Sequence, residues 1–117
     1  MLRQMLKSKI HRAIITDVEL NYEGSIACDP EWLRLADILS GEKVLVANLN
    51  NGARFEPYAI TGKKRQIGLR GAAARLGQTG DRVIIMAFGW MDEKEARRRK
   101  PAVIYMDEHG RSRQKEA

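Results

Sequence analysis

The sequence has 117 residues, which suits one domain with a modest hydrophobic core. Its hydrophobic fraction of 44% is typical of a folded globular protein and excludes a chain that stays disordered. Lysine and arginine outnumber aspartate and glutamate by 21 to 15, a net charge of +6, and the single cysteine excludes an intramolecular disulfide.

The sequence indicates neither a metal site nor a membrane segment. Cys28 belongs to no cluster of cysteines and histidines, and we expect it to be a small buried hydrophobe. The longest uncharged run near the end, residues 83–91, is about half of the ~20 residues that a membrane-spanning helix requires. We therefore expect a cytoplasmic protein.

Two clusters, residues 63–65 and 97–100, carry much of the positive charge, with further basic residues in the tail. A basic surface can bind nucleic acid or an anionic metabolite, or it can simply be solvated. Nucleic-acid binding is disfavoured here because no aromatic residues alternate with the basic runs. We interpret the clusters as a solvated face and tail.

The chain begins with a predicted long, bent strand at residues 2–18, which are rich in β-branched side chains and lack breakers. Residues 17–20 would turn the chain, and residues 26–28 would form a short second strand. Asp29 followed by Pro30 is typical of a helix start, because it combines a capping residue with proline at the first helical position.

This helix is expected to end at Gly41, after which strands dominate. Asn50-Asn51-Gly52 is a strong signal for a tight turn between two strands. The small residues 71–74 would turn the chain again. The other expected elements are strands at 43–48, 53–60, 66–70, 82–90 and 102–106 and a charged helix at 92–100. Residues from Asp107 onward have almost no apolar side chains and are expected to be disordered or bound to another subunit.

Many short strands, turn signals and two minor helices together predict an all-β fold, a small β-barrel with two short helices. We assign residues 1–106 to this domain and residues 107–117 to a polar C-terminal tail. A chain of this length is small for an enzyme pocket built within one subunit.

The Gly24-Ser25 peptide has a chemistry of its own. The serine hydroxyl can attack the preceding carbonyl, converting the amide into an ester, and elimination then cuts the chain. Hydrolysis of the resulting dehydroalanine leaves Ser25 as a pyruvoyl group, a ketone that condenses with amines and withdraws electrons as a cofactor does. Taken alone, Gly-Ser is also an ordinary turn sequence, so the surrounding motifs decide its interpretation.

Five motifs surround or follow this dipeptide in a fixed order: K-I-H-R at 9–12, Y-E-G-S at 22–25, N-G-x-R-F at 51–55, Y-A-I at 58–60 and G-A-A-A at 71–74. In order and spacing the chain resembles the pyruvoyl-dependent aspartate 1-decarboxylases, from Met1 to about Tyr105. The resemblance implies a six-stranded double-psi β-barrel and a homotetramer with active sites between neighbouring subunits. It also implies the conversion of L-aspartate to β-alanine and CO2, a step of pantothenate biosynthesis, with the pyruvoyl group as cofactor.

The resemblance assigns roles to individual residues. Ser25 matches the pyruvoyl precursor, and Gly24 matches the residue on the other side of the cleaved bond. Arg54 matches the binder of the substrate carboxylate, which a guanidinium can grip through two hydrogen bonds. Tyr58 matches the proton donor. The remaining matches are Lys9, which helps to hold the substrate, the site-lining residues His11 and Tyr22, and the small residues Gly71, Ala72 and Ala73, whose backbone would face the substrate.

This chain departs from the family pattern at several places. Pro57 replaces a threonine whose hydroxyl assists self-cleavage, and proline offers no hydrogen-bond donor. Arg70 replaces an asparagine, Ala47 stands where an aromatic residue is common, and the segment before Gly71 is slightly shorter. Pro57 predicts slow maturation, with or without an accessory maturation factor, and the other departures admit a substrate other than L-aspartate as an alternative.

Three further functions are therefore considered beside aspartate decarboxylation. The protein could be a pyruvoyl-dependent decarboxylase of another amino acid, with Arg70 reading a different anionic group. It could be a barrel that is never cleaved and binds a metabolite or a partner. A nucleic-acid-binding barrel is the least favoured.

Overall fold

The structure is a computed structural model that describes residues 1–114. Its elements are β1 (Leu2–Ile14), β2 (Asp17–Glu19), β3 (Ser25–Cys28), α1 (Pro30–Leu35), β4 (Leu45–Asn48), β5 (Arg54–Phe55), β6 (Ala59–Thr61), β7 (Ile67–Arg70), the 3-10 helix η1 (Gly71–Arg75), β8 (Arg82–Asp92), α2 (Glu93–Arg98), β9 (Ala102–Met106) and β10 (Ser112–Gln114). The all-β class with two short α-helices is therefore confirmed. No helix among residues 1–114 is long and apolar enough to cross a membrane.

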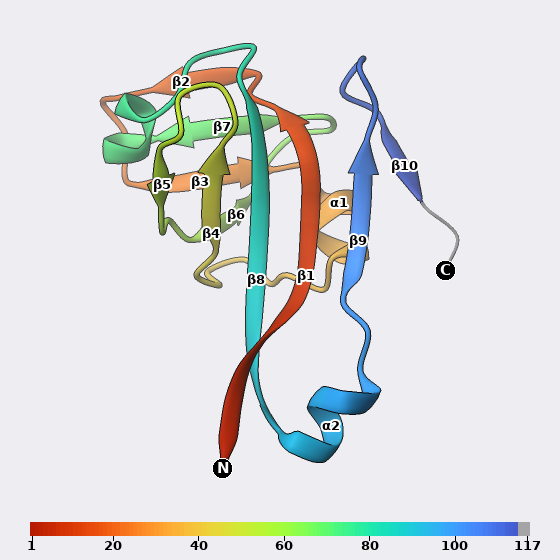
Figure 1. The fold of residues 1–117 in the computed structure, drawn as a ribbon. Coiled ribbons are helices and arrows are strands. Elements are labelled where there is room, and N and C mark those ends of the chain that lie inside the picture. The colour runs from red at the N-terminus through yellow and green to blue at the C-terminus, as the bar shows by residue number, and fades with distance from the viewer. Residues whose placement is uncertain (115–117) are drawn as a thin grey trace.

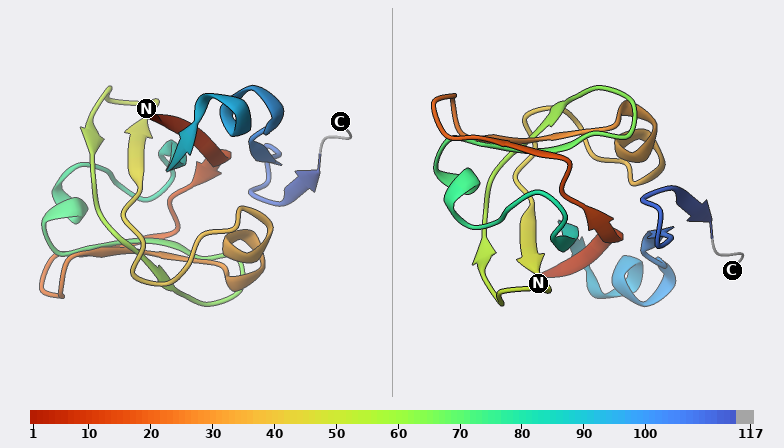
Figure 2. Two further views of the ribbon diagram at one scale, coloured as in Figure 1. Left: turned by 90° about the horizontal axis from the view of Figure 1, so that it is seen from below. Right: turned by 90° about the horizontal axis from the view of Figure 1, so that it is seen from above.

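The strands form two sheets. One has the order β10-β9-β1-β8-β4-β5, and the other has the order β2-β7-β3-β6. In Figure 1 the long strands of the six-stranded sheet run from top to bottom and those of the four-stranded sheet run across them; Figure 2 shows the same crossing from two other sides. These strand orders do not test the double-psi arrangement of a six-stranded barrel, which stays a prediction.

The core lies between the two sheets and is built by alternation along the strands. Ile10 of β1, Val46 of β4 and Ile85 of β8 are fully buried and meet Ile26 and Leu69 from the four-stranded sheet. Each such side chain contributes about 1.5–3 kcal/mol when it leaves water. The residues next to them along the strands point to the opposite, outer face.

Strands β1 and β8 form a long antiparallel ribbon whose far end projects from the body beside α2 (Figure 1). The predicted bend of the first strand is confirmed: its register shifts between Leu6 and Ser8 and again between His11 and Ala13, and Arg12 has a φ of 68°. The predicted turn at 17–20 is wrong, because residues 17–19 form β2 and pair in parallel with β7.

The start of α1 is confirmed and its predicted end is wrong. The Asp29 carboxylate accepts a hydrogen bond from the Glu31 N–H at 2.7 Å, and Pro30 is the first helical residue. The helix ends at Leu35 rather than at Gly41, since Asp37 has a left-handed φ of 54° and redirects the chain into the buried Ile38. Asp37 is a residue type that tolerates this conformation.

The predicted strand at 53–60 is interrupted. Residues 54–55 pair with β4 and residues 59–61 pair with β3, so the two halves belong to different sheets. Pro57 lies between the two halves. Proline has no N–H to donate to a neighbouring strand, so it suits a break in the sheet. The break carries the chain from one sheet to the other directly beside Ser25.

The expectation of disorder from Asp107 onward is wrong for residues 107–114, while residues 115–117 lie outside the described part. The Asp107 side chain accepts hydrogen bonds from the N–H groups of His109 and Arg111, both at 2.9 Å, and Gly110 takes a φ of 73°. This turn allows β10 to pair with β9. Arg82 fastens it to the body by donating to the carbonyl of Asp107 at 2.9 Å.

Cys28 is fully buried, as predicted. Burial, with a smaller contribution from the charge of Asp29, raises the pKa of its thiol to about 12. The thiol therefore stays protonated and unreactive at neutral pH.

Candidate active site

Ser25 begins β3 and lies at the wall of a cavity of about 290 Å3. The side chain is only 2% exposed. The cavity is lined by Gly24, Ser25, Phe55, Glu56, Pro57, Tyr58, Ala72, Ala73 and Leu76. Six of these nine are residues that the sequence analysis singled out, and they come from three separate stretches of the chain.

The backbone around Ser25 is held on both sides. Ser25 lies opposite Arg70 in the antiparallel pairing of β3 with β7, and the next residue, Ile26, donates its N–H to the carbonyl of Tyr58 at 2.9 Å. The Ser25 hydroxyl lies 3.5 Å from the carbonyl oxygen of Glu23. At Gly24, by contrast, a Cβ atom would meet nothing within 4 Å. The bond between Gly24 and Ser25 therefore joins an open position to a fixed one.

Gly71 shows why this segment needs small residues. Its φ of 62° is left-handed, and a Cβ there would lie 2.8 Å from the Gly24 Cα and from the Tyr22 carbonyl oxygen. Only glycine combines this conformation with such a close backbone approach. The next two residues, Ala72 and Ala73, line the cavity, which their small side chains leave open.

Tyr58 and Pro57 form the opposite wall. Tyr58 is 41% exposed, so its phenol has access both to the cavity and to solvent. Pro57 accepts a hydrogen bond from the Val44 N–H at 2.9 Å through its carbonyl and has no donor of its own. At position 57 the cavity wall therefore offers no hydrogen-bond donor.

Arg70 is directed away from the cavity walls described above. Its guanidinium donates to the Asp17 carboxylate and lies over the Tyr22 ring, 5.6 Å from the ring centre. Burial alone would raise the pKa of Asp17, but hydrogen bonds from Arg70, Gln66 and Thr16 outweigh it and lower that pKa. Arg70 thus connects β7 to β2 and to the segment before Gly24, which does not support a role in reading the substrate.

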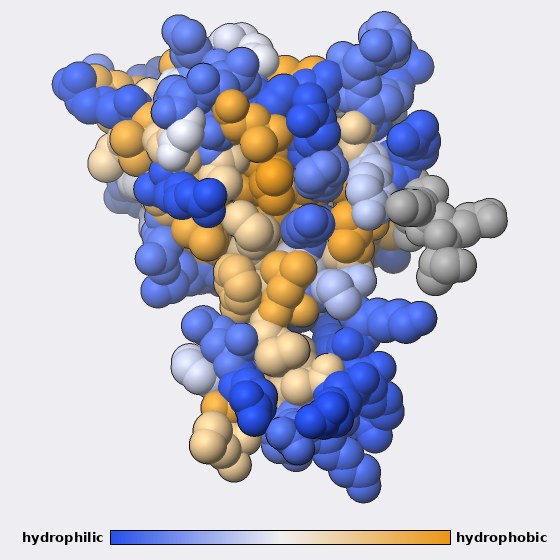
Figure 3. Space-filling view, in the orientation of Figure 1, coloured by the Kyte–Doolittle hydropathy of each residue, from blue (hydrophilic) through white to orange (hydrophobic). Residues whose placement is uncertain are grey.

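Lys9, His11 and Arg54 lie elsewhere, on the outer face of the six-stranded sheet. His11, Ile84, Ala47 and Arg54 stand opposite one another across β1, β8, β4 and β5. Lys9 is two residues from His11 and on the same face. Figure 3 shows a band of apolar side chains over the long strands of this face, bordered by polar ones. None of the three predicted residues lines the Ser25 cavity.

His11 has an unusual environment on that face. Its ring meets Tyr105 edge-on at 5.6 Å, and its Nδ1 is buried without a hydrogen-bond partner among the described residues. Burial, and then the charges of Lys9 and Arg12, lower the pKa of His11. Such a nitrogen is rare in folded proteins, where buried polar atoms are nearly always hydrogen-bonded.

A model of the aspartate decarboxylase family matches residues 1–113. The chain is also 55% identical over 113 residues to an aspartate 1-decarboxylase of Thermoanaerobacter pseudethanolicus, covering 95% of this chain and 97% of that protein. It is 56% identical over 110 residues to the enzyme of that name from Desulfitobacterium hafniense, covering 92% and 87%. The chain belongs to the aspartate decarboxylase family. The match extends past Tyr105, the end of the resemblance seen in the sequence, and includes most of β10.

Membership of the aspartate decarboxylase family gives the Ser25 cavity its context. The cavity combines the Gly24-Ser25 peptide with Tyr58 and the small residues after Arg70, which are the family motifs quoted above. Pro57 stands in the cavity wall, and Arg70 is paired with Asp17. Among residues 1–114 no three His, Cys, Asp or Glu side chains are arranged to hold a metal ion.

Three cavity residues were not predicted from the sequence: Phe55, Glu56 and Leu76. Phe55 was inside a quoted motif, and its place before Glu56 and Pro57 on the crossing segment was the available signal. Leu76 follows the small-residue segment and was not singled out. Glu56, at the cavity edge, forms an ion pair with Lys43 at 3.0 Å.

Proposed function

We propose that this protein is an aspartate 1-decarboxylase that converts L-aspartate to β-alanine and CO2. The observation that carries the proposal is the Gly24-Ser25 peptide at the wall of a cavity that also contains Tyr58, in a chain of this family. Relatives that carry the name aspartate 1-decarboxylase are more than half identical to it over nearly their whole length. The proposal includes a cytoplasmic location.

The cofactor in this proposal is a pyruvoyl group made from Ser25. The residues fit it, because the serine is buried at the cavity wall while the preceding glycine has open space beside it. When formed, the group supplies a ketone that condenses with the substrate amine and accepts the electrons released when CO2 leaves. Ser25 first attacks the Gly24 carbonyl through its hydroxyl, and β3 keeps the attacking residue in position through its pairing on both edges.

Tyr58 is proposed to supply the proton that replaces CO2 on the substrate carbon. Its phenol borders the cavity, and its backbone carbonyl accepts a hydrogen bond from the Ile26 N–H. This bond fixes the backbone position from which the ring extends. The small residues Gly71, Ala72 and Ala73 leave space on the other side of the cavity for a small amino acid. Arg54 is proposed to bind the second carboxylate of the substrate, and Lys9 to assist it.

The proposal requires a second copy of the chain, since Arg54 and Lys9 lie on the outer face of the six-stranded sheet. A homotetramer in which this face covers the Ser25 cavity of a neighbour would bring both sets together. The apolar band on the face and the unpartnered Nδ1 of His11 support such a contact. His11 would then contact the neighbour rather than solvent.

A decarboxylase for another amino acid is the second candidate, and one observation favours it. Ala47 stands between Ile84 and Arg54 in the row across the sheet, so a small side chain occupies the middle of the proposed substrate-binding face. A larger substrate than aspartate would find room there.

Two measurements on the purified protein test the proposal. After an incubation long enough for slow maturation, an intact-mass spectrum should contain two fragments that meet between Gly24 and Ser25, the second of them blocked to Edman degradation. A coupled assay should then detect β-alanine from L-aspartate. Cut protein that ignores aspartate but decarboxylates another amino acid supports the second candidate. Protein that stays whole even with extracts that contain a maturation factor is not a pyruvoyl enzyme.

A further inference from the structure

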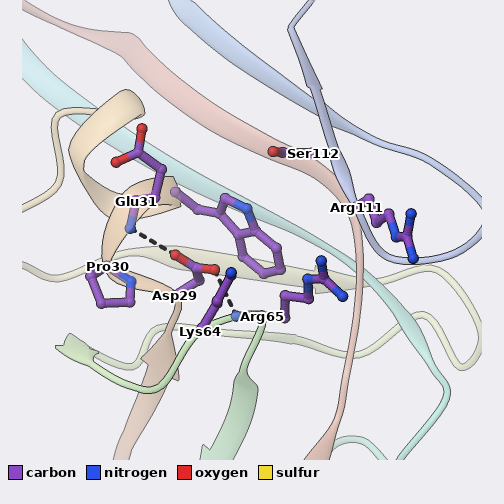
Figure 4. A pocket seen from close by; sticks show the side chains of 8 residues that line it. Asp29, Pro30, Glu31, Lys64, Arg65, Arg111 and Ser112 are labelled. Carbon is purple, nitrogen blue, oxygen red and sulfur yellow. Dashed lines mark hydrogen bonds between the residues drawn. The ribbon is translucent and has the colours of Figure 1, made fainter.

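A second cavity, of about 500 Å3, lies at the other end of β3, outside the site described above. Its walls come from the start of α1, from the turn before β7 and from the hairpin between β9 and β10 (Figure 4). The lining residues are Asp29, Pro30, Glu31, Trp32, Lys64, Arg65, Arg111 and Ser112. The fold thus brings the basic cluster at 63–65 together with the basic C-terminal tail, which are far apart in the sequence.

The turn that carries Lys64 and Arg65 is held firmly. Asp29 accepts a hydrogen bond from the Arg65 N–H at 2.6 Å, and the Asp29 N–H donates to the carbonyl of Gln66 at 2.9 Å. Gln66 closes the turn by accepting from the Lys63 N–H at 2.8 Å. Arg65 itself has a φ of 62°, a conformation that an arginine adopts only where its surroundings require it.

The opposite wall, the hairpin between β9 and β10, is also held by hydrogen bonds. Arg111 closes the hairpin turn, where its N–H and carbonyl both bond to Asp107, and Ser112 follows as the first residue of β10. The side chains of Arg65 and Arg111 therefore start from two fixed segments on different sides of one space (Figure 4).

The charges in this cavity are unbalanced. Lys64, Arg65 and Arg111 form no ion pair among the described residues. The two carboxylates are already engaged: Asp29 by the N–H groups of Glu31 and Arg65, and Glu31 by the side chain of Arg34. Three unpaired cations thus border a cavity that is also lined by Pro30 and Trp32. Trp32 is buried except for the part that faces the cavity.

We propose that this cavity binds a small organic phosphate, with the phosphate held by Arg65, Arg111 and Lys64 and the organic part lying on Pro30 and Trp32. A multiply charged tetrahedral anion can use several cationic donors at once, and guanidinium groups match its oxygens in pairs. The volume is within the usual range for small-molecule sites and exceeds the needs of a bare phosphate ion. This site is independent of the decarboxylase reaction proposed above.

Calorimetric titration of the full-length protein with ADP, inorganic pyrophosphate and adenosine tests the proposal, in a buffer of about 50 mM salt so that surface charges stay effective. ADP should bind with one site per chain, pyrophosphate more weakly, and adenosine not measurably. Arg65→Asn, which keeps a residue that tolerates the left-handed backbone, and Arg111→Gln should each weaken ADP binding by about tenfold or more.

Arg98→Gln is the matched control, because Arg98 is an exposed arginine of α2 outside the cavity and its loss changes the net charge equally. Circular dichroism and the melting temperature confirm that each variant is folded, and the two cavity variants alter separate segments. The proposal is overturned if Arg98→Gln weakens ADP binding as much as they do, or if neither of them weakens it. Pyrophosphate that binds as tightly as ADP, or a short single-stranded oligonucleotide that binds more tightly, also overturns it.

Discussion

The two regions that carry the predicted site residues differ in how complete they are. The Ser25 cavity gathers Gly24, Ser25, Tyr58 and the residues after Gly71 within one chain, so both residues of the proposed cleavage site lie in the same cavity. The outer face of the six-stranded sheet carries Lys9 and Arg54 without any contact to that cavity. Under the proposed function, maturation and turnover are separable: a single chain would carry out the first, and a pair of chains would be required for the second.

The largest effect is expected when the two regions are divided between subunits. Ser25→Ala should stay uncut and inactive, and Lys9→Ala should be cut but nearly inactive. Co-expressed, the two variants should regain activity at about one quarter of the sites, since only some neighbours combine an intact Ser25 with an intact Lys9. The measurement is β-alanine formation by the mixed protein. No recovery in a mixed oligomer would place both regions in the same subunit.

Tyr58→Phe should leave cleavage intact and remove the proposed proton donor. General acids contribute about 10²–10⁴-fold to a reaction rate, so kcat should fall by an amount in that range. The intact-mass spectrum controls for cleavage, because the backbone bond from Ile26 to residue 58 is preserved. Normal turnover by the cut variant would assign protonation to another group.

Pro57→Thr should accelerate maturation. Polarising the Gly24 carbonyl with a preorganised donor is worth about 3–4 kcal/mol, or two to three orders of magnitude in rate, and Pro57 supplies none. Freshly purified protein should therefore be largely uncut. Fragment formation during a timed incubation at fixed temperature compares the two proteins. Complete cleavage of the unmodified protein from the outset would mean that another group polarises the carbonyl.

Arg54→Lys should weaken turnover while cleavage proceeds normally, because Arg54 lies outside the cavity that contains the scissile bond. A lysine cannot reproduce a two-hydrogen-bond contact with a carboxylate, and the expected loss in kcat/KM is about 2 kcal/mol, roughly thirtyfold. Steady-state kinetics on fully cut protein measure it. An unchanged kcat/KM for L-aspartate would remove Arg54 from the site.

The smallest effect is expected from Arg70→Asn, which should lower stability without affecting substrate binding. Losing the contact with Asp17 should cost about 1 kcal/mol, since Asp17 is 41% exposed and the pair is screened. Asp17 has a pKa below its ordinary value of 3.8, so the contribution is present above that value and is lost as pH falls through the lowered pKa. Melting curves should therefore separate the two proteins at pH 7 and converge in acid. Asp17→Asn should reproduce this behaviour.

The sequence predicted what depends on neighbouring residues. Asp29-Pro30 began the helix, Asn51-Gly52 made the turn, and the hydrophobic run 82–90 became most of β8. What could not be predicted depends on pairing between distant segments. Residues 17–19 pair with β7, and the Asp17 side chain bonds to Arg70, 53 positions away, so a segment that resembles a turn becomes β2. The break at Pro57 and the hairpin after Asp107 both had local signals, a proline inside a strand and the turn sequence Asp-Glu-His-Gly. The general composition of the two segments instead favoured a continuous strand at 53–60 and a disordered tail from Asp107.

The pairing of β1 has a consequence for any protein that is cut before Ser25. The fragment that ends at Gly24 would contain β1, a strand of 13 residues paired with β8 on one edge and β9 on the other, and β2, paired with β7. The break would remove no strand pairing, so the two pieces would stay together as a noncovalent complex. Gel filtration would give the same size before and after the cut, and only a denaturing separation would reveal it. Refolding, in turn, would become a bimolecular reaction whose rate depends on protein concentration.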